Sequence, residues 1–285
     1  MTGSSVREAL DASVDALRAA GVDEPRLDAE LLLGEAMGRE RAALVADGAA
    51  EVPPSAARAF GEMVRRRLRR EPVAYILGRK GFRHLDLALD RRVLIPRPET
   101  ELLVELALEL QPATVLDVGT GSGAIALAVA DELPECAVTA TDTSPGALEV
   151  ARANVQRLGL ADRVELLEEA LPEGEFDLVL ANLPYVAERD WPALQPEVTQ
   201  WEPREALLAG ADGLDAYRAL IPGCGRVFPS HGGKSSAALA VEVGEGQAEA
   251  VAGLMRESGF EEVEIRLDLA GIERVVIARW VGGAA

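Results

Sequence analysis

The sequence predicts an α/β fold, in which a seven-stranded, Rossmann-like sheet follows a small N-terminal helical bundle and a linking β-hairpin. Two observations support this prediction. From Thr114 onward, short apolar runs alternate regularly with helical periodicity, which favours a parallel sheet covered on both faces. The residues before about 70 instead show helical spacing throughout. We therefore expect a helical domain at 1–72, a hairpin linker at 73–98 and a sheet domain at 99–285.

The predicted helical domain begins with a capping box, because Ser5 precedes Glu8 by three residues and apolar residues follow at helical spacing. A second helix is expected from Pro25 to Gly38, a short one at 40–46 and another at 54–70. The next stretch alternates apolar and polar residues. It predicts a hairpin with its turn at 90–92 and a second strand at 93–95.

The sheet domain is expected to open with a helix, in whose first turn Pro98 lies. Its strands and helices are then read from the alternating pattern. The expected strands are Thr114–Val118, Ala137–Thr141, Val164–Leu167, 176–181, 237–243, 261–267 and 272–279, and the expected helices are 125–133, 145–158 and 246–258.

The charge balance is strongly acidic, with a formal net charge of −19 over 285 residues. Such a field repels nucleic acid unless a local patch reverses it. One basic segment exists between 58 and 97, either a solvated helix face or a docking surface. Its twelve basic residues are Arg58, Arg65, Arg66, Arg67, Arg69, Arg70, Arg79, Lys80, Arg83, Arg91, Arg92 and Arg97.

Cysteine usage and the N-terminus place the expected setting in the cytoplasm. Cys136 and Cys224 are far apart and form no paired motif, so neither a disulfide framework nor a metal site is expected. The N-terminus shows no signal pattern, and no apolar stretch approaches the roughly 20 residues of a membrane span.

A cofactor site is predicted at the turn Gly119-Thr120-Gly121-Ser122-Gly123, between the first strand of the sheet and a helix. Asp142 ends the next strand, where a carboxylate could accept both ribose hydroxyls of a nucleoside. The glycine spacing is not the dinucleotide fingerprint. The acidic Asp117 entering the turn favours S-adenosylmethionine, whose amino and carboxylate groups could use Asp117 and the free N–H groups expected in the turn. The alternative is a glycine turn that only packs helix against strand.

The tetrad Asn182-Leu183-Pro184-Tyr185 follows a strand and predicts chemistry on an amine or amide nitrogen. The side-chain oxygen of Asn182 and the backbone carbonyl of Leu183 could accept the two N–H bonds of a target amide. Pro184 restricts Leu183 to an extended conformation, and Tyr185 offers a flat face to the planar group. The alternative is a plain strand-to-loop turn, in which Asn and Pro are common.

The sequence resembles the HemK/PrmC family, the release factor glutamine methyltransferases, over nearly its whole length. The run Ile95-Pro96-Arg97-Pro98-Glu99-Thr100-Glu101 is the most specific of the matching stretches. The others are the residues 70–78, 117–126, 182–185, 202–207, 212–214, 268–271 and 274–276.

The resemblance implies a methyltransferase that uses S-adenosylmethionine to methylate the glutamine of the Gly-Gly-Gln motif in class I peptide chain release factors, and so modulates translation termination. By position, Gly119 to Gly123, Asp142, Leu171 and Asn182 would contact the cofactor, and Asn182 to Tyr185 would hold the glutamine. The helical domain would dock the release factor. We expect no direct nucleic acid partner and no membrane association, and of the oligomeric states the monomer is favoured.

Three departures from the family pattern bear on this expectation. Leu183 replaces the first proline of Asn-Pro-Pro-Tyr, which we expect activity to survive because a backbone carbonyl is needed there. Ala170 replaces an acidic or polar residue beside the adenine, a contact that Glu169 could replace. The stretch 224–236 is longer and more polar than the family turn, and we interpret its His231 as a loop residue.

Two other functions fit the same tetrad. An adenine-N6 nucleic acid methyltransferase would need a base-flipping pocket and a basic cleft, which the acidic charge disfavours. A catalytically silent S-adenosylmethionine-binding scaffold is hinted at only by Leu183, and is disfavoured by the presence of Asn182 and Tyr185.

Overall fold

The computed structural model describes residues 4–229 and 237–281, and the chain divides into two compact units. The helical unit comprises Met1–Arg79 together with Gln195–Trp201. The sheet unit comprises Lys80–Leu194 and Glu202–Ala285. The segment Gln195–Trp201 thus belongs to the helical unit, although the residues on both sides of it in the chain belong to the sheet unit.

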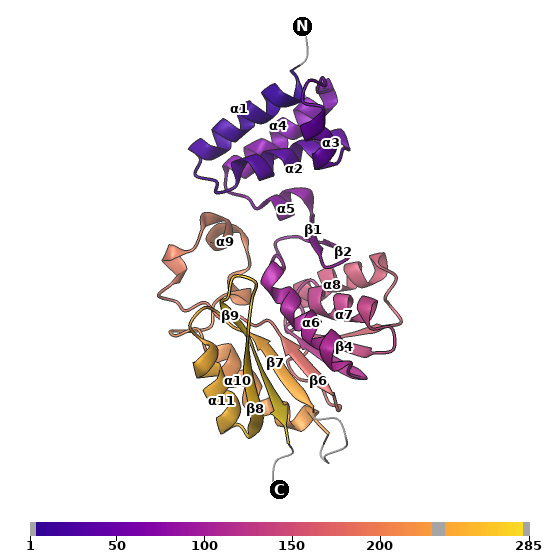
Figure 1. Ribbon diagram of the computed structural model, residues 1–285, viewed down its shortest axis with the longest axis vertical. Helices are drawn as coiled ribbons and strands as arrows, with labels where there is room; N and C mark the ends of the chain where they lie inside the picture. The colour runs from indigo at the N-terminus through magenta and orange to yellow at the C-terminus, as the bar shows by residue number, and fades with distance from the viewer. Residues whose placement is uncertain (1–3, 230–236, 282–285) are drawn as a thin grey trace. The chain divides into compact units, whose positions relative to one another are not determined.

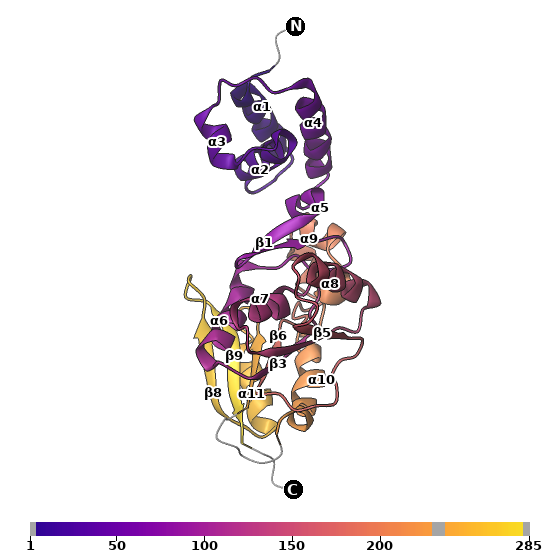
Figure 2. The ribbon, with the colours of Figure 1, turned by 90° about the vertical axis from the view of Figure 1, so that its right-hand side faces the viewer.

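The helical unit packs its helices around a core of leucines with Phe60. Ser5 and Glu8 form the predicted capping box at the start of its first helix. All four helices expected from the sequence are present, within two residues at each end. Figures 1 and 2 show the helices of the unit: α1 (Val6–Ala19), α2 (Pro25–Met37), α3 (Arg41–Ala46), α4 (Pro54–Leu68), α5 (Val73–Leu77) and α9 (Pro196–Trp201).

A buried charge network fixes α9 within the helical unit. The guanidinium of Arg67 lies 2.6 Å from Asp28 Oδ2 and 2.7 Å from Glu197 Oε1, and its side chain is 7% exposed. Arg70 adds a second contact to Glu197, at 2.5 Å. Because removing one partner from a buried ion pair leaves an uncompensated charge, Glu197 is a strong anchor for this short helix.

The linker differs from the sequence prediction. Val73–Leu77 forms α5, and the two-stranded sheet consists of β1 (Arg79–Phe82) and β2 (Leu85–Ala88). The predicted turn at 90–92 is present, with Val93 N donating to the Asp90 carbonyl at 3.2 Å, but it joins no pair of strands, and the predicted strand at 93–95 is wrong. The backbone N–H of Ile95 donates instead to the Glu202 carboxylate at 3.1 Å. Pro96 has no N–H to offer a sheet.

The sheet unit contains a seven-stranded sheet with the order β5-β4-β3-β6-β7-β9-β8. The predicted strands and helices of this region are confirmed to within three residues. Its strands are β3 (Thr114–Val118), β4 (Ala137–Thr141), β5 (Val164–Leu167), β6 (Leu178–Ala181), β7 (Ala238–Glu242), β8 (Phe260–Leu267) and β9 (Glu273–Trp280). Its helices are η1 (Pro98–Thr100), α6 (Glu101–Leu110), α7 (Ala124–Glu132), α8 (Pro145–Arg157), η2 (Trp191–Ala193), η3 (Arg204–Ala206), α10 (Asp215–Cys224), η4 (Gly225–Val227) and α11 (Ala248–Glu257).

The register of the parallel strands brings the predicted site together. Val118 pairs with Thr141 on one side and with Ala181 on the other, and Ala181 pairs in turn with Val241. These four residues are therefore level across the sheet. The residues that follow them, Gly119, Asp142, Asn182 and Glu242, lie at the same edge, where open α/β sheets bind ligands.

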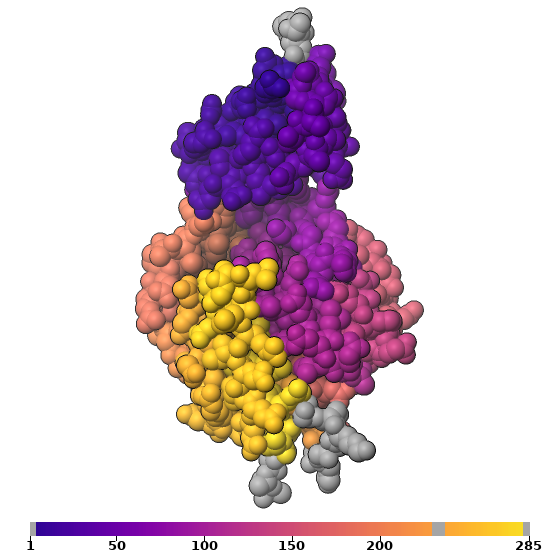
Figure 3. All heavy atoms as spheres, viewed as in Figure 1, coloured from indigo at the N-terminus to yellow at the C-terminus, as the bar shows by residue number. Residues whose placement is uncertain are grey.

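The far end of the sheet is antiparallel, which the sequence analysis did not foresee. β9 pairs antiparallel with both β7 and β8. The connection from Leu267 to Glu273 is too short for a parallel crossover, so it must be a hairpin. Figure 3 shows these C-terminal strands (yellow) at the surface beside the purple to magenta segment that includes α6, and an ion pair of 3.8 Å joins Arg266 to Glu109.

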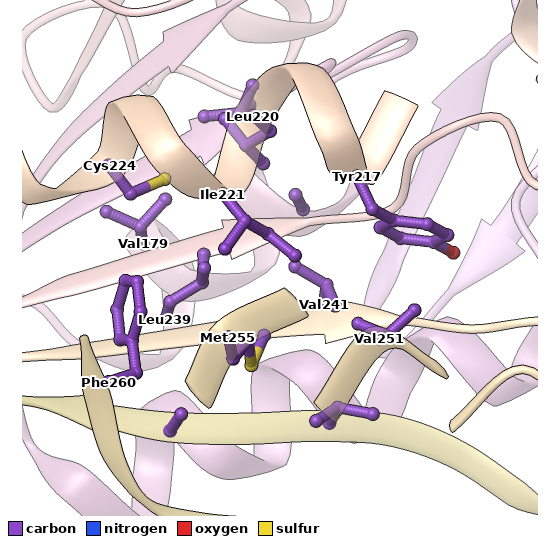
Figure 4. Packing of buried hydrophobic residues seen from close by; sticks show 14 of the residues in the cluster. Val179, Tyr217, Leu220, Ile221, Cys224, Leu239, Val241, Val251, Met255 and Phe260 are labelled. Atoms are coloured by element: carbon purple, nitrogen blue, oxygen red, sulfur yellow. The ribbon is translucent and has the colours of Figure 1, made fainter. Parts of the chain in front are cut away.

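The core under the site is formed by α10 and α11 against β6, β7 and β9. Figure 4 shows Tyr217 and Ile221 of α10 facing Leu239 and Val241 of β7, with Met255 of α11 close by. Sequence analysis did not identify α10. None of the helices in the described parts of the chain is long and apolar enough to cross a membrane.

Candidate active site

A cavity of about 430 Å³ opens at the edge of the sheet where the parallel strands end. This volume lies in the range of small-molecule sites. The sequence-predicted residues on its wall are Gly119, Thr120, Gly121, Ser122, Asp142, Leu171, Asn182, Leu183 and Pro184. Asp117, Gly123 and Tyr185 do not line it.

The glycine turn contributes backbone surface to this cavity. Gly121 has a positive φ of 56°, and a Cβ there would meet no atom within 4 Å, so the ligand space reaches its backbone. The N–H groups of Gly119 and Thr120 both donate to the Thr141 carbonyl at 2.9 Å, and that of Gly121 donates to Asp142. These three amides are already bonded within the protein, so the expectation that they are free for the cofactor's carboxylate is wrong, and what the turn offers a ligand is its exposed backbone.

The carboxylate of Asp142 is fixed by two backbone donors. Its Oδ2 accepts from Gly121 N at 2.9 Å and its Oδ1 from Ser144 N at 2.8 Å. An ionised carboxylate has about four acceptor sites, so two remain for a ligand. Asp142 can therefore accept hydrogen bonds from hydroxyl groups of a ligand in the cavity without rearrangement.

Asp117 is fully buried behind the turn. Its Oδ2 accepts from Thr120 Oγ1 at 2.6 Å and from Ala126 N at 3.2 Å, whereas its Oδ1 has no partner among the described residues. Burial raises the pKa of this carboxyl to about 7. An unpaired buried acceptor is costly, which makes a donor group such as an amine or a water its expected partner.

Asn182 presents an unpartnered oxygen. Its Nδ2 donates to Thr100 Oγ1 at 3.0 Å, and its buried Oδ1 has no partner among the described residues. The next residue, Leu183, lies against the glycine turn, because a Cβ added to Gly119 would be 3.2 Å from Leu183 Cδ2. The tetrad and the glycine turn are thus in contact at the cavity wall.

The backbone carbonyl of Tyr185 is fixed by Gln247 and lies close to Gly213. Gln247 Nε2 donates to the Tyr185 carbonyl at 2.9 Å, and Gln247 Oε1 accepts from Gly244 N at 3.0 Å. Gly213 has a φ of 80°, and a Cβ there would lie 2.3 Å from the same carbonyl oxygen. Burial raises the pKa of the Tyr185 hydroxyl to about 12, so this group stays protonated at neutral pH.

Two residues beside the tetrad were missed as site residues by sequence reasoning. Thr100 Oγ1 donates to Glu242 Oε2 at 2.6 Å, and both side chains are buried. A signal was present in each case. Thr100 lies in the specific run 95–101, and Glu242 is a charged residue that ends the otherwise apolar strand β7.

The basic segment between 58 and 97 is mostly committed to internal ion pairs. Arg66 contacts Glu71 at 2.6 Å, Arg83 contacts Glu132 at 2.7 Å and Arg97 contacts Glu202 at 2.5 Å. At least eight of its twelve basic residues have an acidic partner: Arg65, Arg66, Arg67, Arg70, Arg79, Arg83, Arg92 and Arg97. A count of charges along the chain therefore overstates the positive field of this segment.

Two departures from the family pattern can be located. Glu169 and Ala170 both line the cavity. His231 lies outside the described residues, as does most of the polar stretch around it. Within 4–229 and 237–281, no three histidine, cysteine, aspartate or glutamate side chains are grouped so that they could hold a metal ion.

Comparison with known proteins first defines the class. Residues 115–201 match the family model described as a methyltransferase domain. A solved methyltransferase from Pyrococcus furiosus shares the fold, with a TM-score of 0.51 over 70% of this chain and 91% of that chain at 18% identity. The sheet unit is thus a methyltransferase domain.

The N-terminal part and the full-length relatives then define the family. Residues 8–78 match the model described as the PrmC N-terminal domain. A release factor glutamine methyltransferase of Geobacter sulfurreducens is 42% identical over 281 residues, covering 96% of each chain. One from Cereibacter sphaeroides is 44% identical over 279 residues, covering 95% of this chain and 97% of that protein. This chain belongs to the release factor glutamine methyltransferase family, which confirms the resemblance seen in the sequence.

Proposed function

We propose that this protein transfers a methyl group from S-adenosylmethionine to the side-chain amide nitrogen of the glutamine in the Gly-Gly-Gln motif of a class I peptide chain release factor. The observation that carries the proposal is the buried, unpartnered Oδ1 of Asn182 on the cavity wall. An acceptor in that state suits the N–H of a bound amide. The relatives named release factor glutamine methyltransferases support the choice of substrate.

The residues at the sheet edge fit S-adenosylmethionine. Asp142 retains acceptor capacity for two ribose hydroxyls, and the unpaired Oδ1 of Asp117, which does not line the cavity, suits an amino group reached through water. Leu171 and the backbone of Gly121 complete the wall on that side. When bound there, the cofactor supplies an electrophilic methyl group on a positively charged sulfur.

The tetrad would position the target nitrogen. Asn182 Oδ1 accepts one N–H bond of the substrate amide and the Leu183 carbonyl accepts the other, so that the nitrogen faces the methyl group. Pro184 restricts Leu183 to extended backbone, which fixes the direction of that carbonyl. Tyr185 provides a flat surface for the planar amide.

Electrostatics favour the transfer step. An amide nitrogen is a weak nucleophile, because its lone pair is delocalised into the carbonyl. It would gain positive charge as it takes up the methyl group that the bound cofactor would supply. The two acceptors stabilise this developing charge most strongly in the transition state. The nitrogen then loses one proton to water, so no strong base is required.

The substrate sets the cellular context. A release factor is a protein of translation, so we expect this enzyme to act in the cytoplasm. We also expect it to be a monomer and to make no direct contact with nucleic acid. The helical unit is the proposed docking element for the release factor. Most arginines in the part of this unit that the structure describes, such as Arg66, Arg67 and Arg70, are paired with acidic residues, so shape and apolar contact would contribute alongside charge.

The test is transfer of labelled methyl from S-adenosylmethionine to a purified class I release factor. The same assay is run on a release factor with its Gly-Gly-Gln glutamine changed to alanine, on duplex DNA, and with the Asn182→Ala enzyme. We expect label on the unmodified factor alone, and a loss of about 100-fold to 1000-fold in kcat for Asn182→Ala.

Other outcomes would contradict the proposal. Label on DNA would identify an adenine methyltransferase. Label on the glutamine-to-alanine factor would place the modified residue elsewhere. No label on any substrate, despite cofactor binding, would identify a silent scaffold.

A further inference from the structure

A chain of hydrogen bonds runs from Asn182 through Thr100, both of which line the cavity, to Glu242, which does not. Asn182 Nδ2 donates to Thr100 Oγ1 at 3.0 Å, and Thr100 Oγ1 donates to Glu242 Oε2 at 2.6 Å. Asn182 and Glu242 follow paired residues of β6 and β7, whereas Thr100 ends η1. Three segments that are distant in the sequence therefore meet behind the predicted catalytic side chain.

The protons available to these three side chains determine which group donates and which accepts in each hydrogen bond. When the Glu242 carboxyl is ionised it only accepts, so the single hydroxyl proton of Thr100 then goes to Glu242, the direction that the structure shows. The hydroxyl oxygen is then left with lone pairs only, and the group that Asn182 turns toward it must be the NH₂. The side-chain oxygen of Asn182 is consequently directed to the other side, which is where the unpartnered Oδ1 is found.

We propose that Thr100 and Glu242 are positioning residues that orient the Asn182 amide, so that its oxygen and not its NH₂ receives the substrate N–H. This inference rests on the proposed function of Asn182. With the amide reversed, two N–H donors would face each other across the site and the substrate amide would be repelled. The tetrad alone does not prevent that reversal, because the two ends of an Asn side chain have nearly the same shape.

The surroundings of Glu242 suit this role. Its backbone carbonyl accepts from the buried Tyr217 hydroxyl at 2.7 Å, which fixes the end of β7. The charged and titratable groups around its carboxyl are Arg97, Glu99, Tyr185, Tyr217 and Arg274. The two arginines favour the ionised form, whereas burial and Glu99 disfavour it, with burial the largest influence.

Substitutions of Thr100 distinguish a role of its hydroxyl in orienting Asn182 from a role of its side chain in packing. Thr100→Val keeps the shape and removes the hydroxyl, Thr100→Ser keeps the hydroxyl, and Thr139→Val on β4 is the matched control for a threonine outside the site. We expect Thr100→Val to lower kcat by about 10-fold to 100-fold with KM for the release factor changed less than about 3-fold. Thr100→Ser should recover most of the activity. A Thr100→Val kcat within about 3-fold of the unmodified enzyme would overturn the proposal.

A double variant tests whether Thr100 acts through Asn182. In an Asn182→Ala background there is no amide to orient, so adding Thr100→Val should reduce kcat no further. An equal loss in both backgrounds would mean that Thr100 acts by another route, and would also overturn the proposal. Calorimetric cofactor binding and the melting temperature identify any variant that has simply failed to fold.

A second readout does not depend on methyl transfer. The side-chain amide of Asn182 gives a pair of NMR signals, assigned by their absence in Asn182→Ala. We expect these signals to shift and to lose protection from hydrogen exchange in Thr100→Val, but not in Thr139→Val. Unchanged signals would refute the orienting role. If the unmodified enzyme fails to methylate the release factor, the proposed function fails, and this measurement still decides the hydrogen-bond chain.

Discussion

The buried carboxyl of Glu242 is predicted to make the stability of the protein depend on pH. Its side chain is 2% exposed, and burial raises its pKa from 4.5 to about 7. The folded state therefore holds this proton more tightly than the unfolded chain does. Stability accordingly falls as pH rises from about 4.5 to about 7 and stays lower above that range. The difference between the two pKa values corresponds to about 3 kcal/mol.

Glu242→Gln removes the charge and keeps the size of the side chain. At pH 8 the variant should be more stable than the unmodified protein by up to about 3 kcal/mol, whereas near pH 4.5 the two should be nearly equal. For a unit of this size, 3 kcal/mol corresponds to roughly 6 to 12 °C in melting temperature. The same change should lower the rate of methyl transfer. A glutamine can turn its NH₂ toward Thr100, which reverses the donor and acceptor roles in the hydrogen bonds to Thr100 and Asn182. A stabilised but less active enzyme is the expected combination.

Differential scanning calorimetry from pH 4.5 to 8.5 measures this effect. Asp117 is also buried, and burial raises its pKa to about 7, but it is present in both proteins and cancels in the comparison. Glu165→Gln, at an exposed position on β5, is the matched control and should show no pH-dependent difference. A difference in melting temperature for Glu242→Gln that is constant with pH, or larger at low pH, would refute the reasoning.

Two further predictions concern the tetrad and the helical unit. Leu183→Pro restores the family tetrad and should keep kcat within about 3-fold in the labelled-methyl assay, because the backbone carbonyl remains; a loss above about 10-fold would show that the Leu183 side chain against Gly119 is needed. Glu197→Ala leaves buried Arg67 short of a partner and should destabilise the helical unit by about 3–5 kcal/mol. Urea unfolding followed by Trp201 fluorescence, with the other two tryptophans changed to phenylalanine, measures this; an unchanged midpoint would show that the ion pair contributes nothing.

Local sequence signals predicted most of the sheet unit. β3 and β4 have the expected bounds because each is an apolar, β-branched run that ends at a glycine turn or an aspartate. α5 was missed because five apolar residues between Pro72 and Gly78 show no helical period. α10 was missed because Pro222 and Gly223 near its end read as a loop, although Pro222 lies inside the helix.

Contacts between distant residues could not be predicted in the same way. The sequence predicts Asn182 at a strand end, but the partner of its NH₂, Thr100, lies 82 residues earlier in the chain, and the partner of that hydroxyl, Glu242, lies 142 residues after Thr100. The number of basic residues between 58 and 97 was a poor guide to the charge of that surface for a related reason. Several arginines from 58 to 97, among them Arg70 and Arg97, are paired with Glu197 and Glu202, which belong to another part of the chain. Only the folded structure shows which charges neutralise each other.

Hydrogen bonds to other segments fix the first and last residues of the tetrad, whereas its two middle residues make no such bond to the rest of the described chain and line the cavity. Thr100 fixes the side chain of Asn182, and Gln247 fixes the backbone of Tyr185. Leu183 and Pro184, between these anchors, line the cavity. A loop anchored in this way tolerates a change of side chain in its middle as long as the backbone path is kept. On this reasoning we expect the tetrad to tolerate a leucine at its second position, whereas its asparagine and tyrosine are the residues fixed by Thr100 and Gln247.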